Sequence, residues 1–389
     1  MLGSFCTMAE LKVTRETFPL LELPSGDSVG IRVVTIEKVN SSSTSTFLIT
    51  ANIHGDEVTG VVVSHRLIDW LCENPEKVEG KIVIIPSLNP SGLLQASRFP
   101  AFDAQDPNRT WPDSKPKNIG VAPDEPKTDT WYDIQKQVED RTRPQNEAFN
   151  RLYAFIEDTI RPDYHVDLHT FSTISIPFIF LDRLTFNNEN ETKDQETPLW
   201  DRTNEFVQQL GLTVVMERPV HLYIKQKLHR STSGTTLNKL RIPSCTIELG
   251  PMDCVPPACR SAGVSAVLNG LIHAGNITNT ERFPITEVPV LRFEKPHRYL
   301  VYPLSPATGI VDFYVTCGEP FKQGETLGVI RHMNGQLQAE VKADMDGYII
   351  AWFNGVAVHK NQPLGMVAVE DGNVPIIAAW QDLPLATFY

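Results

Sequence analysis

The stretch Phe47–Gly60, FLITANIHGDEVTG, decides the fold, because it joins an apolar strand to a helix through a short polar turn. The strand stops at His54, and Glu57 follows three residues later, just before the expected helix. This spacing brings an imidazole nitrogen and a carboxylate oxygen within reach of one point. Catalytic zinc sites often take two protein ligands in this way and a third from a distant segment. A His and a Glu at this spacing also occur by chance, so partners elsewhere in the chain must decide.

A third ligand is expected in the segment 161–170, RPDYHVDLHT, which reads as a buried strand ending at His169. Four strand residues span roughly 13 Å at about 3.3 Å each, so His165 and His169 cannot both bind one ion. His169 is favoured, because open α/β sheets bind ligands at the carboxyl ends of their strands. His165 is then expected to be a partly buried, hydrogen-bonded histidine. Two interpretations stay open for Asp167, which either orients an imidazole or pairs locally.

Further residue types that a hydrolase needs occur in three other segments. Glu248 interrupts the apolar strand SCTIELG, where an unpaired carboxylate would cost several kcal/mol. Arg98 in QASRFP and Asn108–Arg109 in QDPNRTWP both follow the apolar strand KIVIIPSLNP. Such a loop suits the binding of a carboxylate and the stabilisation of an oxyanion, although surface loops often carry arginine.

The order of these blocks resembles the succinylglutamate desuccinylase/aspartoacylase family, which is related to the zinc carboxypeptidases. Four sequence blocks follow one another from about residue 45 to 275: HGDE, NP…SRF…DPNR, DLHT and IELG. The resemblance is specific because all four blocks occur in this order. The resemblance implies a zinc-carboxypeptidase-like mixed α/β sheet with helices on both faces, and an N-acyl amino acid deacylase activity. It also implies roles for the residues above: zinc (Zn²⁺) binding by His54, Glu57 and His169, a general base at Glu248, polarisation of the scissile carbonyl by Arg98, and binding of the substrate carboxylate by Asn108 and Arg109.

Two features depart from the family pattern. DPNR replaces the usual DLNR, and Pro107 fixes its own φ and removes a backbone donor, which bears on the placement of Arg109. The segment after DLHT, FSTISIPFIFLDR, is unusually apolar, and it bears on the identity of the substrate.

The sequence therefore predicts a zinc-dependent amidohydrolase that cleaves an amide (N-acyl) bond of a small, carboxylate-bearing substrate. Two alternatives remain at this point: a metallocarboxypeptidase acting on a peptide end, and a non-catalytic binding relative of the fold. The retention of every expected ligand and of Glu248 argues against the binding relative.

The composition agrees with an enzyme that acts on small molecules. The formal net charge of −12 and the pI of about 5.3 argue against a nucleic acid or an anionic membrane as partner.

Six cysteines without dense or paired spacing are typical of free thiols in a reducing compartment, and Cys254 and Cys259 are expected to be ordinary buried thiols. The amino terminus lacks the pattern of a secretory signal, and no apolar run of 18 residues occurs. A cytoplasmic protein is expected, and a homo-oligomer is compatible with the sequence.

Two domains are expected: a catalytic domain over 1–280 and a β-rich domain over 281–389. The segment 110–146 is polar and proline-rich and is interpreted either as a lid or as an inert insertion. The catalytic domain is predicted to alternate strands and helices, namely helix 58–72, strand 81–86, helix 147–160, strand 164–168, helix 199–210, strand 213–216, strand 244–249 and helix 261–275.

The C-terminal domain, with GEPFKQGETLGVI and ADMDGYI, resembles the barrel-sandwich hybrid of biotinyl and lipoyl carriers. A carrier needs a lysine at a hairpin tip, whereas Lys342 in EVKADM lies inside a strand-like run. We therefore expect this domain to be structural or to form a wall of the active site.

Overall fold

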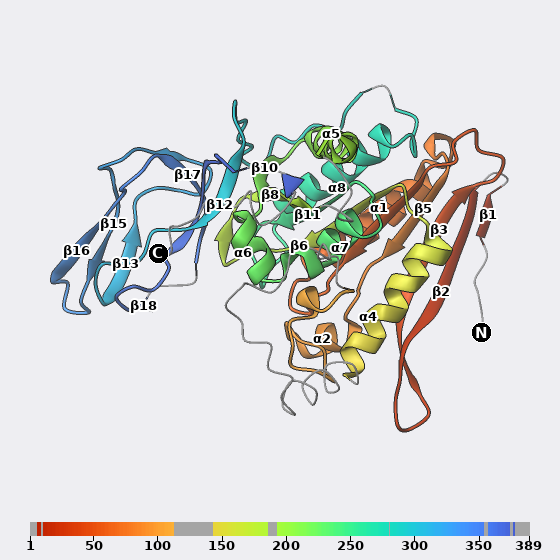
Figure 1. Ribbon diagram of the computed structural model, residues 1–389, viewed down its shortest axis with the longest axis horizontal. Coiled ribbons are helices and arrows are strands. Elements are labelled where there is room, and N and C mark those ends of the chain that lie inside the picture. Colours follow the sequence, from red (N-terminus) through yellow and green to blue (C-terminus); the bar gives the residue numbers. More distant parts are fainter. Residues whose placement is uncertain are drawn as a thin grey trace.

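The computed structural model describes residues 6–8, 11–112, 143–185, 193–279, 281–353, 357–373 and 376–377. One large mixed sheet runs through the molecule, and a smaller all-β unit lies at one end of it (Figure 1). The predicted mixed α/β sheet with helices on both faces, followed by a separate C-terminal sheet, is confirmed. The expected boundary at residue 280 stays a prediction.

Parallel strands form the centre of the large sheet, and antiparallel strands extend it on both sides. β4, β5, β6 and β11 run parallel to one another, whereas β3 is antiparallel to β5 and β8 is antiparallel to β11. In spatial order the strands are β1 (Cys6–Met8), β2 (Leu11–Glu22), β3 (Ser28–Lys38), β5 (Lys81–Ile85), β4 (Thr46–Ala51), β6 (Tyr164–His169), β11 (Ser244–Leu249), β8 (Pro177–Leu181), β10 (Thr213–Met216), β12 (His297–Val301), β19 (Gly365–Glu370), β17 (Gly347–Trp352) and β14 (Pro320–Phe321), with β7 (Ile174–Ser175) beside β17.

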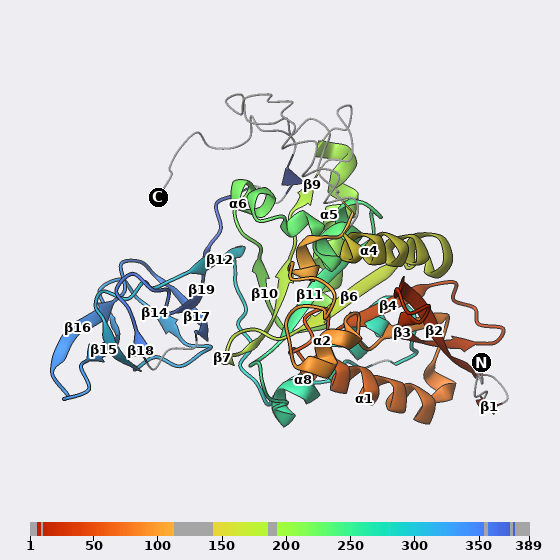
Figure 2. The same cartoon turned by 90° about the horizontal axis from the view of Figure 1, so that it is seen from below.

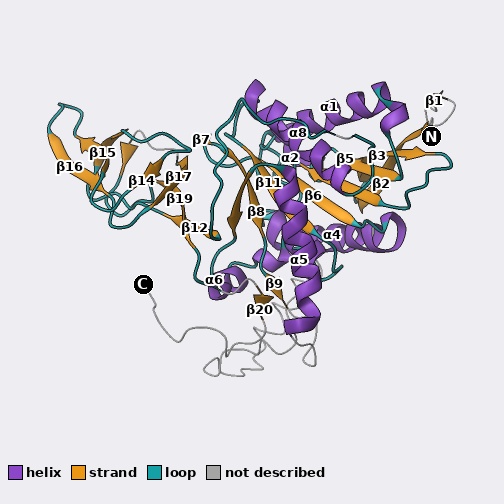
Figure 3. Cartoon of the chain, turned by 90° about the horizontal axis from the view of Figure 1, so that it is seen from above, coloured by secondary structure: helices purple, strands orange, loops and turns teal. Residues whose placement is uncertain are grey.

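Helices cover both faces of this sheet. α1 (Thr59–Glu73) and α8 (Pro257–His273) lie together on one side, and α4 (Pro144–Phe155) lies on the other (Figures 2 and 3). α5 (Lys193–Leu210) packs against α8. Shorter elements complete the connections: α2 (Pro90–Gln95), α6 (Val220–Lys225), α7 (Thr232–Asn238), 3₁₀ turns at Pro75–Lys77, Pro107–Arg109 and Leu228–Arg230, and a π turn at Ile156–Ile160 after α4.

The alternation of side chains along the central strands separates an apolar face from the face that carries the polar groups. Alternate residues of β4, β6 and β11 belong to the core that α1, α5 and α8 cover; they are Phe47, Ile49, Ala51, Val166, Leu168, Cys245, Ile247 and Leu249. Since neighbouring residues of a strand point to opposite faces, the residues between them point to the other face; they include Thr50, His165, Asp167, His169, Ser244, Thr246 and Glu248.

The C-terminal part is built from short strands, as predicted. Its separate sheet contains β13 (Gly309–Phe313), β15 (Thr326–Arg331), β16 (Leu337–Lys342) and β18 (Ala357–Val358). Lys342 ends β16, and its Nζ lies 3.0 Å from a carboxylate oxygen of Glu340. A carrier lysine is expected at a hairpin tip, so this position favours the structural interpretation.

Some sequence expectations differ from the observed elements. The hairpin of β2 and β3 was not predicted, α5 begins at Lys193 rather than 199, and α8 begins at Pro257 rather than 261. The Pro257 start is favourable because proline is tolerated in the first turn of a helix. Most of the segment 110–146, which is interpreted either as a lid or as an inert insertion, lies outside the described residues, because these omit 113–142.

Two further observations concern cysteines and membranes. Five of the six cysteines carry free thiols: Cys72, Cys245, Cys254, Cys259 and Cys317. Cys254 is exposed, whereas a buried thiol was expected, and Cys259 is buried. No helix among the described residues is long and apolar enough to cross a membrane.

Candidate active site

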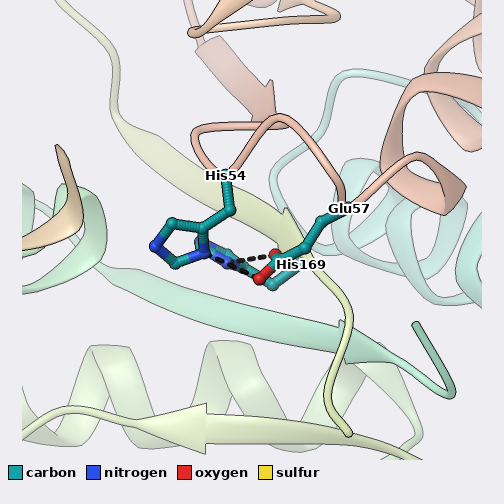
Figure 4. A group of neighbouring side chains, drawn as sticks. All are labelled: His54, Glu57 and His169. Atoms are coloured by element: carbon teal, nitrogen blue, oxygen red, sulfur yellow. Dashed lines mark hydrogen bonds and ion pairs between the residues drawn. The ribbon is translucent and has the colours of Figure 1, made fainter. Parts of the chain in front are cut away.

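His54, Glu57 and His169 converge on one point at the carboxyl ends of β4 and β6 (Figure 4). Nδ1 of His54 lies 2.7 Å from Oε1 of Glu57, and Nδ1 of His169 lies 2.8 Å from Oε2 of the same carboxylate. All three residues are buried, and their ligand atoms lie within 4.8 Å of one another. Two imidazoles and one carboxylate form the ligand set that open zinc sites use.

The turn that presents His54 and Glu57 is held by the side chain of Asn52. Its amide nitrogen donates hydrogen bonds to the carbonyls of His54, Gly55 and Glu57. Asn52 has a φ of +56°, which asparagine tolerates better than most residues. At Gly55 a Cβ would lie 2.0 Å from the carbonyl carbon of Gly92. Only glycine therefore allows this turn to pass so close to α2.

His169 is oriented by a carboxylate on its own strand. Its Nε2 lies 2.8 Å from Oδ2 of Asp167, which is fully buried. This is the contact that the orienting interpretation of Asp167 requires. This contact leaves Nδ1 of His169 to face Glu57, as in the carboxylate–histidine pairs that fix the tautomer of a metal ligand.

His165 does not join the three residues but anchors a chain of buried hydrogen bonds behind them. Oγ1 of Thr50 donates to Oδ1 of Asp167 at 2.6 Å and lies 2.8 Å from Nε2 of His165. Nδ1 of His165 lies 2.8 Å from the hydroxyl of Ser244. Since the Thr50 proton goes to Asp167, Nε2 of His165 must donate, and Nδ1 then accepts from Ser244. Burial lowers the pKa of His165 to about 4, so its imidazole is neutral. His165 is thus the hydrogen-bonded histidine that the sequence suggested, although it is fully rather than partly buried.

Asp106 links two of the predicted site residues and was missed by the sequence reasoning. Its Oδ1 lies 3.0 Å from Nε2 of His54, and its Oδ2 accepts from Arg98 at 2.8 Å. Although burial opposes ionisation, His54 and Arg98 hold the pKa of Asp106 well below its usual value. Arg98 also lies 3.5 Å from Glu57. A carboxylate before Pro-Asn-Arg was the available signal, because it could cap the turn that follows.

Pro107 begins a 3₁₀ turn that places Asn108 and Arg109 at the cavity. The side chain of Asp106 accepts from the backbone N–H of Asn108 and so caps this turn. Oδ1 of Asn108 accepts from the backbone N–H and the hydroxyl of Thr232 at the start of α7. Arg109 lines the cavity, and one of its guanidinium nitrogens donates to the carbonyl of Asn108. Proline suits the first position of such a turn, so Pro107 does not direct Arg109 away from the site.

Glu248 lies on β11 opposite His169 and points into the same cavity. It is 6% exposed, and its Oε2 has no hydrogen-bond partner in the described part of the chain. Burial raises the pKa of Glu248 to about 8, although the neighbouring His169 opposes this shift. A buried carboxylate without a partner is costly, so its presence in the cavity calls for a functional explanation.

The cavity itself has a volume of about 240 Å³. All seven site residues suggested by the sequence line it, from four separate parts of the chain. The sequence reasoning missed a second group of lining residues, which lie on β8, directly after β10, on α7 and on β12; examples are Phe180, Glu217, Arg218, Ser233 and Tyr299. Tyr299 belongs to the predicted C-terminal domain, so this part of the chain forms a wall of the cavity. Apart from the unusually apolar segment around Phe180, no motif marked these positions.

Comparison with known proteins identifies the family. The model of the succinylglutamate desuccinylase/aspartoacylase catalytic domain matches residues 43–273. The chain belongs to this family. Members of the succinylglutamate desuccinylase/aspartoacylase family are deacylases, and this chain carries the buried His54–Glu57–His169 group on the same domain.

Individual relatives are distant but cover nearly the whole chain. The N-alpha-acetyl-L-2,4-diaminobutyric acid deacetylase of Halomonas elongata is 21% identical over 341 residues, which cover 87% of this chain and 86% of the deacetylase. A succinylglutamate desuccinylase/aspartoacylase structure from Rhodobacter sphaeroides has a TM-score of 0.63 at 20% identity and covers 94% of this chain and 96% of its own. The product-bound ectoine utilization protein EutE (DoeB) of Ruegeria pomeroyi has a TM-score of 0.61 at 18% identity, with 95% and 98% covered. The two structural matches show that the fold extends through the C-terminal part.

Proposed function

We propose that this protein is a zinc-dependent deacylase that hydrolyses the amide bond of a small N-acylated amino acid. One observation carries the proposal: the unpartnered Oε2 of Glu248 shares a cavity with the His54–Glu57–His169 group. A proton-accepting carboxylate beside a metal-ligand set is what hydrolysis of an amide needs.

The residues fit a zinc ion. Two Nδ1 atoms and a carboxylate face one another, and Asp106 and Asp167 contact the opposite nitrogens of the two imidazoles. Such outer contacts fix the orientation of metal ligands. When bound at three protein ligands, zinc lowers the pKa of water toward about 7 and polarises a carbonyl oxygen.

Glu248 is proposed to be the general base. It takes a proton from the attacking water as the water oxygen bonds to the carbonyl carbon. It returns that proton to the nitrogen as the carbon–nitrogen bond breaks, which leaves a carboxylic acid and a free amine. The pKa of about 8 holds in the absence of a cation, and a nearby divalent ion favours the ionised form that a base requires.

Three residues of the 98–109 loop are proposed to position the substrate. Arg98 is fixed by Asp106 and lies beside Glu57, where it can stabilise the oxyanion of the tetrahedral intermediate. Asn108 and Arg109 are proposed to bind the carboxylate of the amino acid, which a planar guanidinium recognises well.

The size of the cavity supports a small substrate rather than a peptide end. A volume of about 240 Å³ lies below the range of roughly 300–1,000 Å³ that is usual for ligand pockets. The deacetylase from Halomonas elongata removes an acyl group from an amino acid derivative, as its name states, and this supports the same reaction class here.

The test is a screen of N-acyl amino acids with the zinc-loaded protein, following release of free amine. We expect turnover of at least one of them, and about one zinc per chain by elemental analysis. The His54→Ala variant should lose both the bound zinc and the turnover. The control variant His65→Ala, at an exposed position on α1, should retain both. Equal zinc content in the two variants would contradict the ligand assignment, and turnover by the metal-free parent would contradict zinc dependence.

A further inference from the structure

A chain of buried hydroxyl groups leads from Asp182 to the floor of the catalytic cavity. Asp182 directly follows β8 and is 2% exposed. Oγ of Ser233, on α7, donates to Oδ2 of Asp182 at 2.6 Å and lies 2.9 Å from Oγ1 of Thr246, on β11. Ser233 and Thr246 both line the cavity. This hydroxyl chain therefore connects a buried carboxylate to a hydroxyl that a substrate can reach.

The carboxylate of Asp182 fixes the direction of each hydrogen bond in the hydroxyl chain. The hydroxyl of Tyr223 donates to Oδ1 of Asp182 at 2.8 Å, so both oxygens of the ionised acid accept. A hydroxyl group has one proton to donate, and Ser233 uses its proton in the bond to Asp182. The bond between Ser233 and Thr246 must then contain the proton of Thr246. In this state the Thr246 hydroxyl can only accept a hydrogen bond from a ligand in the cavity.

The groups around Asp182 leave it ionised in the slightly alkaline range. Burial and the charge of Glu217 raise the pKa of Asp182 to about 7, whereas its two hydroxyl donors and Arg109 favour the ionised form. The charge of Asp182 also acts on Tyr223 and Cys245; burial raises the pKa of both, so both side chains are neutral. The directions of the hydrogen bonds described above are therefore those present at pH 8.5.

Thr246 lies between the proposed general base and the proposed carboxylate site. It precedes Glu248 by two residues on β11, so the two side chains share a face of the sheet about 7 Å apart along the strand. Arg109 lines the same cavity and acts by its charge on Asp182, at the other end of the hydroxyl chain. In an N-acyl amino acid the amide N–H and the carboxylate are attached to the same Cα atom. A substrate with its carboxylate at Arg109 and its carbonyl carbon beside Glu248 therefore brings its N–H to Thr246.

We propose that Thr246 accepts a hydrogen bond from the N–H of the scissile amide, and that Ser233 and Asp182 are positioning residues that hold its hydroxyl in the accepting orientation. This inference rests on the proposed function. The bond fixes the plane of the amide during attack by water, and it leaves the lone pair that develops on the nitrogen free to take the proton from Glu248. An ester has an oxygen lone pair where the amide has its N–H, so it presents a second acceptor to Thr246. The hydroxyl chain therefore selects amides over esters of the same shape.

The experiment compares an amide with the ester of the same shape at pH 8.5. The pair consists of the N-acetyl amino acid that the zinc-loaded protein hydrolyses fastest and the O-acetyl derivative of the 2-hydroxy acid with the same side chain. Thr246→Val should lower the amide-to-ester ratio of kcat/KM by about tenfold or more, the effect of one hydrogen bond. Thr246→Ser retains the hydroxyl and should keep the ratio of the parent. Thr17→Val makes the same change at an exposed position on β2 and should also keep it.

Two further variants test the positioning residues, which do not need to touch the amide. Ser233→Ala frees the Thr246 hydroxyl to rotate, so the amide-to-ester ratio should fall toward that of Thr246→Val. Asp182→Asn should lower the ratio at least as far. The Tyr223 hydroxyl accepts from Asn238 and keeps donating to the side-chain oxygen at position 182, so the new amide nitrogen faces Ser233. The hydroxyl chain then runs in the opposite direction, and Thr246 presents a proton to the cavity. If both variants keep the ratio of the parent, the positioning roles are wrong.

A binding measurement separates this inference from the proposed function. The methylphosphonamidate of L-alanine has an N–H where the methylphosphonate ester of L-lactate has an oxygen, and calorimetry gives the affinity of the zinc-loaded protein for each. The parent should prefer the phosphonamidate by about tenfold or more, and Thr246→Val should lose this preference. Equal preferences in the two proteins, or binding of neither compound, overturn the inference while measured deacylase turnover stands. If no acylated amino acid is hydrolysed but only the parent prefers the phosphonamidate, the deacylase function fails and the hydrogen bond to Thr246 stands.

Discussion

The hydroxyl of Thr50 donates a hydrogen bond of 2.6 Å to Oδ1 of Asp167, and this bond crosses from β4 to β6 in the centre of the sheet. Asp167 uses its other oxygen to contact His169. Thr50 therefore influences the orientation of a proposed metal ligand without touching it. Because Thr50 also accepts from His165, its hydroxyl connects two polar side chains that are both fully buried.

Thr50→Val should weaken zinc binding by roughly 10–100-fold, the usual effect of losing an outer contact of a metal ligand. The substitution keeps the shape but leaves Nε2–H of His165 and one oxygen of Asp167 without a partner. It should also cost about 1–3 kcal/mol of unfolding free energy for each buried polar group left unsatisfied. Chelator competition would measure the affinity, and urea unfolding would measure the stability.

Thr50→Ser is the matched control, because it retains the hydroxyl and loses only a methyl group. Its zinc affinity should stay close to that of the parent, even though the lost methyl lowers the stability. If Ser and Val weaken zinc binding equally, packing rather than the hydrogen bond to Asp167 matters at this position.

Glu248→Gln should retain zinc and lose turnover. The amide cannot accept the proton from the attacking water, so kcat is expected to fall by roughly 10² or more. Amine release and elemental analysis on the same preparation check the two parts of this prediction. A variant without zinc would make Glu248 a ligand or a folding residue, and a variant with near-normal turnover would remove its role as base.

The sequence alone was sufficient to predict the candidate site residues that lie at the ends of strands. His54, His169 and Glu248 are polar residues at the ends of apolar runs, and such positions in a parallel sheet lie along one edge, so their proximity follows from topology. The same argument predicted that His169 lies at the site and that His165 does not. The register of β6 places His165 beside Leu48 and His169 beyond the end of β4.

The rest of the cavity depended on contacts that no local pattern specifies. β8 is antiparallel to β11 and brings Phe180 beside Thr246, and an isolated apolar run does not reveal its direction in a sheet. Tyr299 reaches the cavity from a strand about 130 residues beyond His169 in the sequence. Asp106 acts through contacts with His54 and Arg98 that arise only when the loop folds over the turn at 54–57.

Asp182 should make the protein less stable as the pH rises from about 4 to 7. Burial and the charge of Glu217 raise the pKa of Asp182 to about 7, whereas the unfolded chain has a value of about 3.9. Between these values the folded state binds more protons than the unfolded state. The unfolding free energy therefore falls with rising pH, by up to about 1.4 kcal/mol per pH unit.

Asp182→Asn removes this dependence. Between pH 5 and 8 the unfolding free energy of the parent should fall by about 3 kcal/mol more than that of the variant. The reason is that the slope of about 1.4 kcal/mol per pH unit acts over roughly two pH units of this range. Urea unfolding at the two pH values would measure the difference, with Asp69→Asn at an exposed site of α1 as the control. Parallel curves for the parent and Asp182→Asn would show that Asp182 ionises normally in the folded protein.

Arg109 and Arg98 should affect different kinetic constants. Arg109 is expected to pair with the substrate carboxylate in both the ground state and the transition state, so Arg109→Ala should raise KM with little change in kcat. Arg98 is held between Asp106 and Glu57, beside the metal-ligand group. It is expected to act on the developing oxyanion, and Arg98→Ala should therefore lower kcat, by about 10²-fold or more if one oxyanion donor is lost.

A substrate with an amidated carboxylate tests the first of these roles directly. The parent should process the amide poorly, because Arg109 then loses its charged partner, whereas Arg109→Ala should not discriminate between acid and amide. The ratio of kcat/KM for the two compounds, measured in both proteins, gives the coupling between Arg109 and the carboxylate. If the parent accepts the amide as readily as the acid, no carboxylate is bound at Arg109, and the amino acid class of substrate fails even where the zinc chemistry holds.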